Sequence, residues 1–201
     1  MAEFPADPNM LPMLKGVPLI GFRGKNSIAA ESLWQDKPCL VMVVRRPGCS
    51  LCRAQAKELA DQRAKLKELG VRLVAVSHQD DSAADFVDLY FGRDDDDVAG
   101  EFKSDSLYLD ATKTFYKALG KGNVRKLGFW GVLSSKMWSN SSSAGKMGVQ
   151  GNYSGDYSHL GGVMLIGKGE EGVLWSFQEV NFGDRAPIPN LLQACTQAVA
   201  K

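Results

Sequence analysis

Two apolar segments on either side of an amphipathic one constrain the fold of this chain more than any other feature. Residues 40–44 and 71–77 are continuous runs rich in Val and Leu, which is typical of strands covered on both faces. Between them, residues 50–69 place apolar side chains on one helical stripe, and Gly70 supplies a C-terminal stop. This order predicts a βαβ unit with parallel strands, and therefore an α/β fold.

The rest of the chain extends this unit into a sheet flanked by helices. We expect an edge strand at 17–22, a helical turn at 27–34, a helix at 82–91, a strand at 107–110, a helix at 112–119, a hairpin formed by 162–166 and 173–177, and a closing helix at 189–200. The antiparallel hairpin makes the expected sheet a mixed one. Residues 1–16 are Pro-rich and are expected to form an irregular leader before one domain at 17–201, in which residues 120–160 show little pattern.

Charge and hydropathy exclude several classes of protein. With 24 Lys and Arg against 23 Asp and Glu, the formal net charge is +1, so no nucleic-acid partner is expected. No apolar run approaches the roughly 18 residues of a membrane span, and the first residues lack the pattern of a signal peptide. Four cysteines are too few for a disulfide scaffold. We therefore expect a cytoplasmic protein.

Cys49 and Cys52 carry the strongest chemical signal. They lie where a buried strand gives way to a helix, so their sulfurs share one face of its first turn. The positive end of the helix, with Arg45 and Arg46 nearby, favours a thiolate, and Gly48 is expected to leave the backbone open to a substrate. Cys49 is the predicted nucleophile, and Cys52, one turn inside the helix, would attack the oxidised Cys49 and close a disulfide.

Two other interpretations of this pair stay open: half of a zinc site, or two inert core thiols. A zinc site needs two further ligands, but Cys39 lies at the far end of the strand, about 16 Å away. His78 and His159 are isolated in the sequence. A Cys-x-x-Cys pair on a βαβ unit favours redox chemistry, and no metal is expected.

Several other features have a simpler structural explanation. Residues 167–172 fit G-x-G-x-x-G, but a strand follows, so a hairpin turn is favoured over a nucleotide site. The acidic run 94–97 lacks the spacing of a calcium loop. His78 follows a buried strand, and a hydrogen-bonded histidine is favoured there over a general base. Cys195 is favoured as a buried structural thiol over a second resolving one.

The segment 45–53, Arg-Arg-Pro-Gly-Cys-Ser-Leu-Cys-Arg, resembles the active site of the peroxiredoxin-like 2 family, the relatives of selenoprotein U. The resemblance continues at 126–129, 151–156, 160–163 and 182–184 and covers about residues 20–195. It implies a thioredoxin-like fold, antioxidant or redox-regulatory activity, and Cys49 and Cys52 as the redox-active pair. One branch of the family reduces prostaglandin endoperoxides with electrons from thioredoxin.

The chain departs from related families at two places. Peroxiredoxins place Thr or Ser three residues before the peroxidatic cysteine, where this chain has Arg46. Thioredoxins have a cis-proline before a late strand, whereas residues 159–162 read His-Leu-Gly-Gly. These departures put efficient peroxidase turnover and thioredoxin-type docking in question. Arg46 is nevertheless a candidate to stabilise a thiolate or a bound oxygen anion.

The leading hypothesis is a thiol oxidoreductase that reduces a small peroxide, endoperoxide or disulfide through Cys49 and Cys52. Thioredoxin or glutathione would regenerate the dithiol, and no bound cofactor is needed. The alternatives are a prostaglandin endoperoxide reductase of the prostaglandin F synthase type and a non-enzymatic redox sensor or binding protein on the same scaffold.

Overall fold

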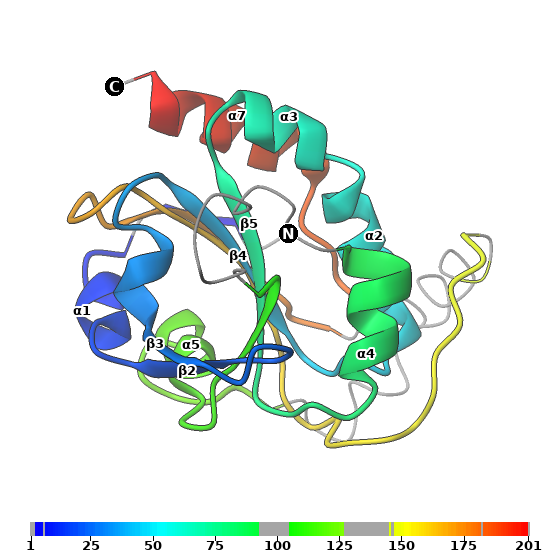
Figure 1. Cartoon of the computed structure of the whole chain (residues 1–201). Helices are drawn as coiled ribbons and strands as arrows, with labels where there is room; N and C mark the ends of the chain where they lie inside the picture. The colour runs from blue at the N-terminus through cyan, green and yellow to red at the C-terminus, as the bar shows by residue number, and fades with distance from the viewer. Residues whose placement is uncertain are drawn as a thin grey trace.

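The computed structural model describes residues 3–5, 7–92, 105–126, 145, 147–181 and 183–200 (Figure 1). Its strands are β1 (Glu3–Pro5), β2 (Pro18–Gly21), β3 (Ser27–Ala29), β4 (Cys39–Val44), β5 (Arg72–Ser77), β6 (Leu107–Leu109), β7 (Gly162–Ile166) and β8 (Val173–Gln178). Its helices are α1 (Met10–Leu14), the 3₁₀ turn η1 (Ala30–Leu33), α2 (Ser50–Ala60), α3 (Arg63–Glu68), α4 (Ala83–Asp85), the π-helical η2 (Phe86–Phe91), α5 (Thr114–Leu119) and α7 (Ile188–Val199).

The strands form one mixed sheet in the order β1-β8-β7-β4-β5-β6-β2-β3. β4 and β5 are parallel along their whole length, which confirms the predicted βαβ unit. β7 pairs antiparallel with β4 on the other side and with β8 in the predicted hairpin. β2 is present but lies inside the sheet, because β3 forms the edge beyond it.

Helices cover both faces of the sheet, as Figure 1 shows, with α2, α3, α4 and α7 on one face and α1 and α5 on the other. Alternate residues of β4 therefore enter different cores. Leu40, Met42 and Val44 pack with α2 and α7, whereas Val41 and Val43 pack with α1 and α5. All six residues of β4 are buried, which explains why its sequence lacks alternation.

Some expected helices are divided in the structure. The helix predicted at 50–69 breaks between α2 and α3 at residues 61–62, and Gly70 ends it with a φ of +71°, as the sequence predicted. The segment 27–34 begins as strand β3 before its helical turn, and 82–91 is α4 followed by π-helix.

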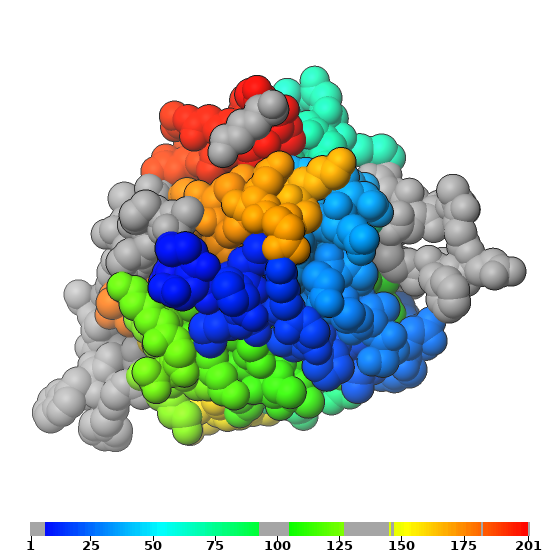
Figure 2. Space-filling view, turned by 90° about the vertical axis from the view of Figure 1, so that its left-hand side faces the viewer, coloured from blue at the N-terminus to red at the C-terminus, as the bar shows by residue number. Residues whose placement is uncertain are grey.

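The expectation of an irregular segment over residues 1–16 is wrong. β1 pairs antiparallel with β8, and α1 buries Met10, Leu11 and Leu14 in the second core. Figure 2 shows the blue N-terminal segment against the orange β7–β8 hairpin. Proline within the first turn of a helix costs little, so Pro12 does not prevent α1 from forming.

The acidic run 94–97 and the residues 127–129 and 182 of the family resemblance lie outside the described residues. Within the described part of the chain, none of the helices has both the length and the apolar character of a membrane span.

Candidate active site

Cys49 and Cys52 lie at the C-terminal end of β4. The strand ends at Val44, a short turn follows, and α2 begins at Ser50 with Cys49 as its N-cap residue. The two side chains are hydrogen-bonded to each other and are not joined by a disulfide. The structure therefore holds the pair as a dithiol in the first turn of the helix, where the sequence placed it.

Arg45 is the cation that contacts the Cys49 sulfur. Its Nη2 lies 2.7 Å from Cys49 Sγ, and its Nε lies 3.8 Å from Glu179 Oε2, at the end of β8. The backbone N–H of Gly161 donates to the same carboxylate oxygen at 3.0 Å. Both charged side chains are buried, with 4% and 6% exposed, so a buried row of charges leads from Glu179 through Arg45 to the sulfur.

This environment separates the two thiols in acidity. The hydrogen bond from Cys52 holds the pKa of Cys49 well below its ordinary value, and Arg45 and two backbone N–H groups act in the same direction against the cost of burial. The same hydrogen bond, together with burial, raises the pKa of Cys52. The surroundings of Cys49 thus favour its thiolate and those of Cys52 its thiol, an arrangement that a nucleophile and a resolving thiol would require.

Glu179 is a buried acid that sequence reasoning missed. Burial raises its pKa to about 7, although Arg45 opposes the shift. The pKa of Arg45 is raised despite its burial, because Cys52, Cys49 and Glu179 all favour its charge. The only sequence signal was an acidic residue directly after an apolar strand, 130 positions after Cys49 and 127 after Cys52, which the fold brings to the cysteine site through Arg45.

Arg46 points elsewhere. Its Nη1 donates to the carbonyl oxygen of Ser154 at 2.6 Å, which fastens the turn to residues that precede β7. The sequence analysis chose Arg46, and not Arg45, as a site residue. In the structure, Arg45 is the arginine that contacts the Cys49 sulfur. A role for Arg46 in stabilising a bound anion stays a prediction.

Gly48 does not leave the backbone open, contrary to expectation. A Cβ at this position would lie 2.2 Å from Asn152 Oδ1, and the Asn152 N–H donates to the Gly48 carbonyl at 2.7 Å. Asn152 also donates to Ser82 Oγ at 2.8 Å. Residues 150–156, here called the covering segment, thus lie directly against the cysteine turn, and a side chain at 48 would have to displace that of Asn152.

Arg53 joins the covering segment to the helix that carries the cysteines. From within α2, its Nε donates to the Pro47 carbonyl at 2.8 Å and its Nη1 to the Gln150 carbonyl at 2.9 Å. The ring of Tyr90 lies 5.0 Å from its guanidinium carbon. The Arg53 side chain is 4% exposed. This one buried cation therefore connects the cysteine turn to the covering segment.

Gly161 explains why the chain lacks a proline before β7. A Cβ at Gly161 would lie 2.2 Å from the carbonyl oxygen of Val43, in the neighbouring strand β4. Among the described residues no peptide bond is cis. The backbone here approaches β4 too closely for any side chain, proline included, and its N–H is used to hold Glu179.

We predict that iodoacetamide labels Cys49 alone in the native, reduced protein at pH 7. The low pKa of Cys49 supplies thiolate, whereas burial raises the pKa of Cys195 to about 12 and both burial and Cys49 raise that of Cys52. Cys39 lies at the opposite end of β4 in the second core. Peptide mapping by mass spectrometry would check this result, with the denatured chain as the control for full labelling. Labelling of Cys195 or Cys52 before Cys49 would contradict the assignment.

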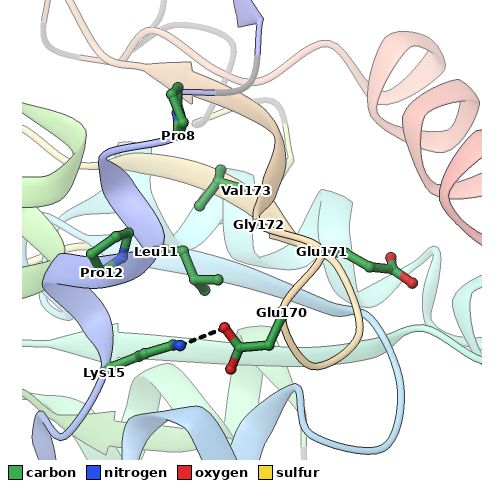
Figure 3. A pocket seen from close by; sticks show the side chains of 8 residues that line it. All are labelled: Pro8, Leu11, Pro12, Lys15, Glu170, Glu171, Gly172 and Val173. Carbon is green, nitrogen blue, oxygen red and sulfur yellow. Dashed lines mark hydrogen bonds and ion pairs between the residues drawn. The ribbon is translucent and has the colours of Figure 1, made fainter.

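A pocket of about 540 Å³ lies at the far end of the sheet from the cysteines. Figure 3 shows Leu11 of α1 and Val173 of β8 facing one another across it, with Lys15 paired to Glu170 at its rim. The adjoining turn 167–172 is the predicted hairpin turn. Because β7 runs antiparallel to β4, this turn is beside Cys39, and the pocket does not belong to the redox site.

Comparisons with known proteins show the family and the fold of the chain. A family model described as AhpC/TSA antioxidant enzyme matches residues 58–181. Peroxiredoxin-like 2A of Rattus norvegicus is 38% identical over 82% of this chain and 66% of its own length. Prostamide/prostaglandin F synthase of Bos taurus is 34% identical over 84% and 79%. Reduced Prx3 of Vibrio vulnificus, solved with hydrogen peroxide, shares the fold with a TM-score of 0.56 at 14% identity, covering 97% and 96%.

Proposed function

The chain belongs to the AhpC/TSA antioxidant-enzyme family, among the peroxiredoxin-like 2 proteins with a thioredoxin-like fold, and we propose on this premise that it is a dithiol oxidoreductase acting through Cys49 and Cys52. The observation that supports this most is the position of Cys49 Sγ. It lies between a buried guanidinium and the thiol of Cys52 at the N-terminus of a helix.

The proposed reaction transfers two electrons from the dithiol to the substrate. With a hydroperoxide, the Cys49 thiolate attacks the terminal oxygen, a sulfur–oxygen bond forms, the oxygen–oxygen bond breaks, and an alcohol leaves with a proton from the medium. The Cys52 sulfur then attacks the Cys49 sulfenic acid. The disulfide forms, and the thiol proton and the hydroxyl leave as water.

Arg45 supports this sequence at both stages. Its guanidinium stabilises the thiolate before the attack and remains beside the oxygen that is transferred to sulfur. Reduced thioredoxin or glutathione would supply two electrons to return the disulfide to the dithiol. A cytoplasmic location, where both systems keep thiols reduced, stays a prediction.

The second candidate is reduction of a prostaglandin endoperoxide. Its support is the 34% identity to a prostamide/prostaglandin F synthase over most of both chains. The Cys49 thiolate attacks one oxygen of the endoperoxide, the oxygen–oxygen bond breaks, and the second oxygen takes a proton from the medium. Attack of the Cys52 sulfur on the Cys49 sulfur then forms the disulfide and breaks the sulfur–oxygen bond, and the first oxygen leaves with the thiol proton, so both oxygens stay in one product as hydroxyls. The proposed reaction with an endoperoxide uses the same two cysteines and requires no further residue. The two candidate functions therefore differ only in which substrate can enter the site.

We predict multiple turnovers on at least one member of a substrate panel when thioredoxin, thioredoxin reductase and NADPH are supplied. The panel contains hydrogen peroxide, tert-butyl hydroperoxide, a prostaglandin endoperoxide and a small disulfide, with NADPH oxidation as the readout. Glutathione with its reductase replaces thioredoxin in a parallel series. Oxidation that stops at one equivalent per chain with every substrate would favour the sensor alternative and overturn the enzymatic proposal.

A further inference from the structure

The two histidines of this chain, His78 and His159, lie side by side, although they are far apart in the sequence. His78 follows β5, and His159 lies three residues before β7 begins. Their ring centroids are 4.5 Å apart, and their side chains are 5% and 3% exposed. The fold thus gathers all of the chain's imidazoles into one buried position at the edge of the sheet.

A carboxylate completes the cluster. Asp156 Oδ2 lies 2.9 Å from His159 Nδ1 and 4.0 Å from His78 Nε2, and the three atoms all lie within 4.8 Å of one another. The other oxygen, Oδ1, accepts the backbone N–H of Ser158 at 2.8 Å. This hydrogen bond orients the carboxylate so that Oδ2 faces the two rings.

One atom of the cluster lacks a hydrogen bond. His78 Nε2 is fully buried and has no hydrogen-bond partner in the described part of the chain, although it lies near the Asp156 carboxylate. The opposite ring nitrogen, Nδ1, lies 3.2 Å from the Tyr116 hydroxyl, which donates to the Val44 carbonyl. Since that hydroxyl proton is already used, the ring donates from Nδ1, and Nε2 carries a lone pair directed into the cluster.

We propose that His78 Nε2, His159 Nδ1 and Asp156 Oδ2 bind a divalent transition-metal ion of the zinc class. Two imidazoles and one carboxylate form a ligand set typical of Zn²⁺ sites that keep a fourth position for water. The Tyr116 hydroxyl is the outer-shell group that fixes the His78 tautomer for coordination. The site is distinct from Cys49 and Cys52 and does not depend on their chemistry.

The ligand spacing requires a small closure. Tetrahedral zinc ligands lie about 3.3 Å apart, so the two longer separations must shorten by roughly 1 Å. Asp156 lies on the covering segment and is 45% exposed, so its side chain has room to move between the rings. The Tyr116 hydroxyl keeps the His78 proton on Nδ1, so the lone pair on Nε2 is free to coordinate without the release of a proton.

Lys113 competes with the metal. Its Nζ lies 3.1 Å from His159 Nε2, and an ammonium group can only donate, so in the metal-free state Nε2 accepts and Nδ1–H donates to Asp156. Coordination through Nδ1 moves the ring proton to Nε2 and displaces the ammonium toward solvent. Replacement of Lys113 by Met should therefore strengthen metal binding rather than weaken it.

The test must separate this cluster from the cysteine thiolates. We would titrate Zn²⁺ into the Cys49→Ser/Cys52→Ser protein by calorimetry and, in parallel, into the oxidised wild-type protein, whose disulfide offers no thiolate. The expected result is about one ion per chain in both. Because the chain has two histidines, its imidazole ¹H–¹⁵N spectrum holds two sets of signals, and both should shift on saturation.

Variants assign the ligands. His159→Ala and Asp156→Asn should each weaken Zn²⁺ binding at least tenfold, or about 1.4 kcal/mol. Asp61→Asn, which removes an exposed carboxylate at the end of α2, should leave it unchanged, and Lys113→Met should tighten it. Circular dichroism would show that each variant is folded, and a variant that is not folded is replaced by His159→Gln or Asp156→Ser. Co²⁺ should give visible bands of nitrogen and oxygen ligands without thiolate charge transfer.

Three results would overturn the proposal. These are the absence of binding in both thiolate-free forms, unchanged affinity in folded variants at positions 156 and 159, and histidine signals that do not respond to Zn²⁺. None of them would affect the redox proposal. Conversely, a chain without turnover on any oxidised substrate would still be expected to bind the metal.

Discussion

Replacing Cys49 by Ser is expected to abolish thiol-coupled reduction, lowering turnover by roughly 10³-fold or more, because the attacking atom is lost. A serine hydroxyl is not ionised near pH 7, even beside Arg45, and oxygen is a poor nucleophile toward peroxide oxygen. The measurement is NADPH oxidation with the best substrate of the panel. The matched control is Cys195→Ser, which changes a buried thiol of α7 outside the site.

Cys52→Ser should give a different defect from the same assay. The Cys49 thiolate still attacks, but without the Cys52 sulfur its oxidised form is not resolved within the chain. Mixed disulfides with glutathione or with the attacking thioredoxin cysteine should then accumulate and be visible on non-reducing gels. Equal turnover in the Cys49→Ser protein would contradict the assignment of the nucleophile, and full turnover in Cys52→Ser would contradict that of the resolving thiol.

Arg45→Met should lower both the reactivity of Cys49 and the stability of the fold. A hydrogen bond to a charged group contributes about 1.5–3 kcal/mol, so the alkylation rate at pH 7 should fall by roughly 10- to 100-fold. Loss of one partner of a buried ion pair costs about 3–5 kcal/mol, reduced here because Glu179, with a pKa near 7, can protonate. Alkylation kinetics against pH and urea unfolding would measure the two effects.

The sign of the pH effect follows from the direction of the shift. The pKa of Cys49 in the folded chain lies below its ordinary value, so the ionised thiol stabilises the fold at high pH and that stability is lost as pH falls through the folded pKa. Alkylation falls over the same interval. In Arg45→Met both profiles should move to higher pH, because the guanidinium no longer favours the thiolate.

A double variant separates chemistry from folding. In Arg45→Met/Glu179→Gln the buried carboxylate is removed together with its partner, so much of the lost stability should return, while the alkylation rate should stay low. Arg185→Met is a suitable comparison, since it breaks a partly buried arginine–glutamate pair with Glu58, outside the cysteine site. An alkylation profile of Arg45→Met that coincides with that of the wild-type chain would refute the role of Arg45.

The sequence was sufficient for the parts of the fold that depend on local pattern. The β4–α2–β5 unit, the hairpin β7–β8 and the position of the cysteine pair follow from apolar runs, helical spacing and one stop glycine. The segment at residues 1–16 was misjudged because its five-residue helix is stabilised by burial in the second core, and burial of so short a helix leaves little periodicity to detect.

The electrostatics of the site could not be predicted from the sequence, because they depend on contacts between distant segments. Two adjacent arginines look equivalent as letters, yet the turn after β4 directs Arg45 to the sulfur and Arg46 to Ser154. Glu179 reaches Arg45 only because β8 lies two strands from β4. His78 and His159 looked isolated for the same reason. They come together only because the residues that lead into β7 pass beside the end of β5.

The covering segment packs closely against the cysteine turn, and this packing has a consequence for the rate at which a substrate reaches Cys49. Cys49 is only 6% exposed, and hydrogen bonds from Arg46, Arg53 and Asn152 hold the segment in place. Where an oxidant reaches the sulfur only after the segment has lifted, we expect the observed rate to be the product of an opening equilibrium and the rate of the attack itself. Selectivity between a small peroxide and a bulky lipid would then be decided by how far the segment must open for each, before any bond is made.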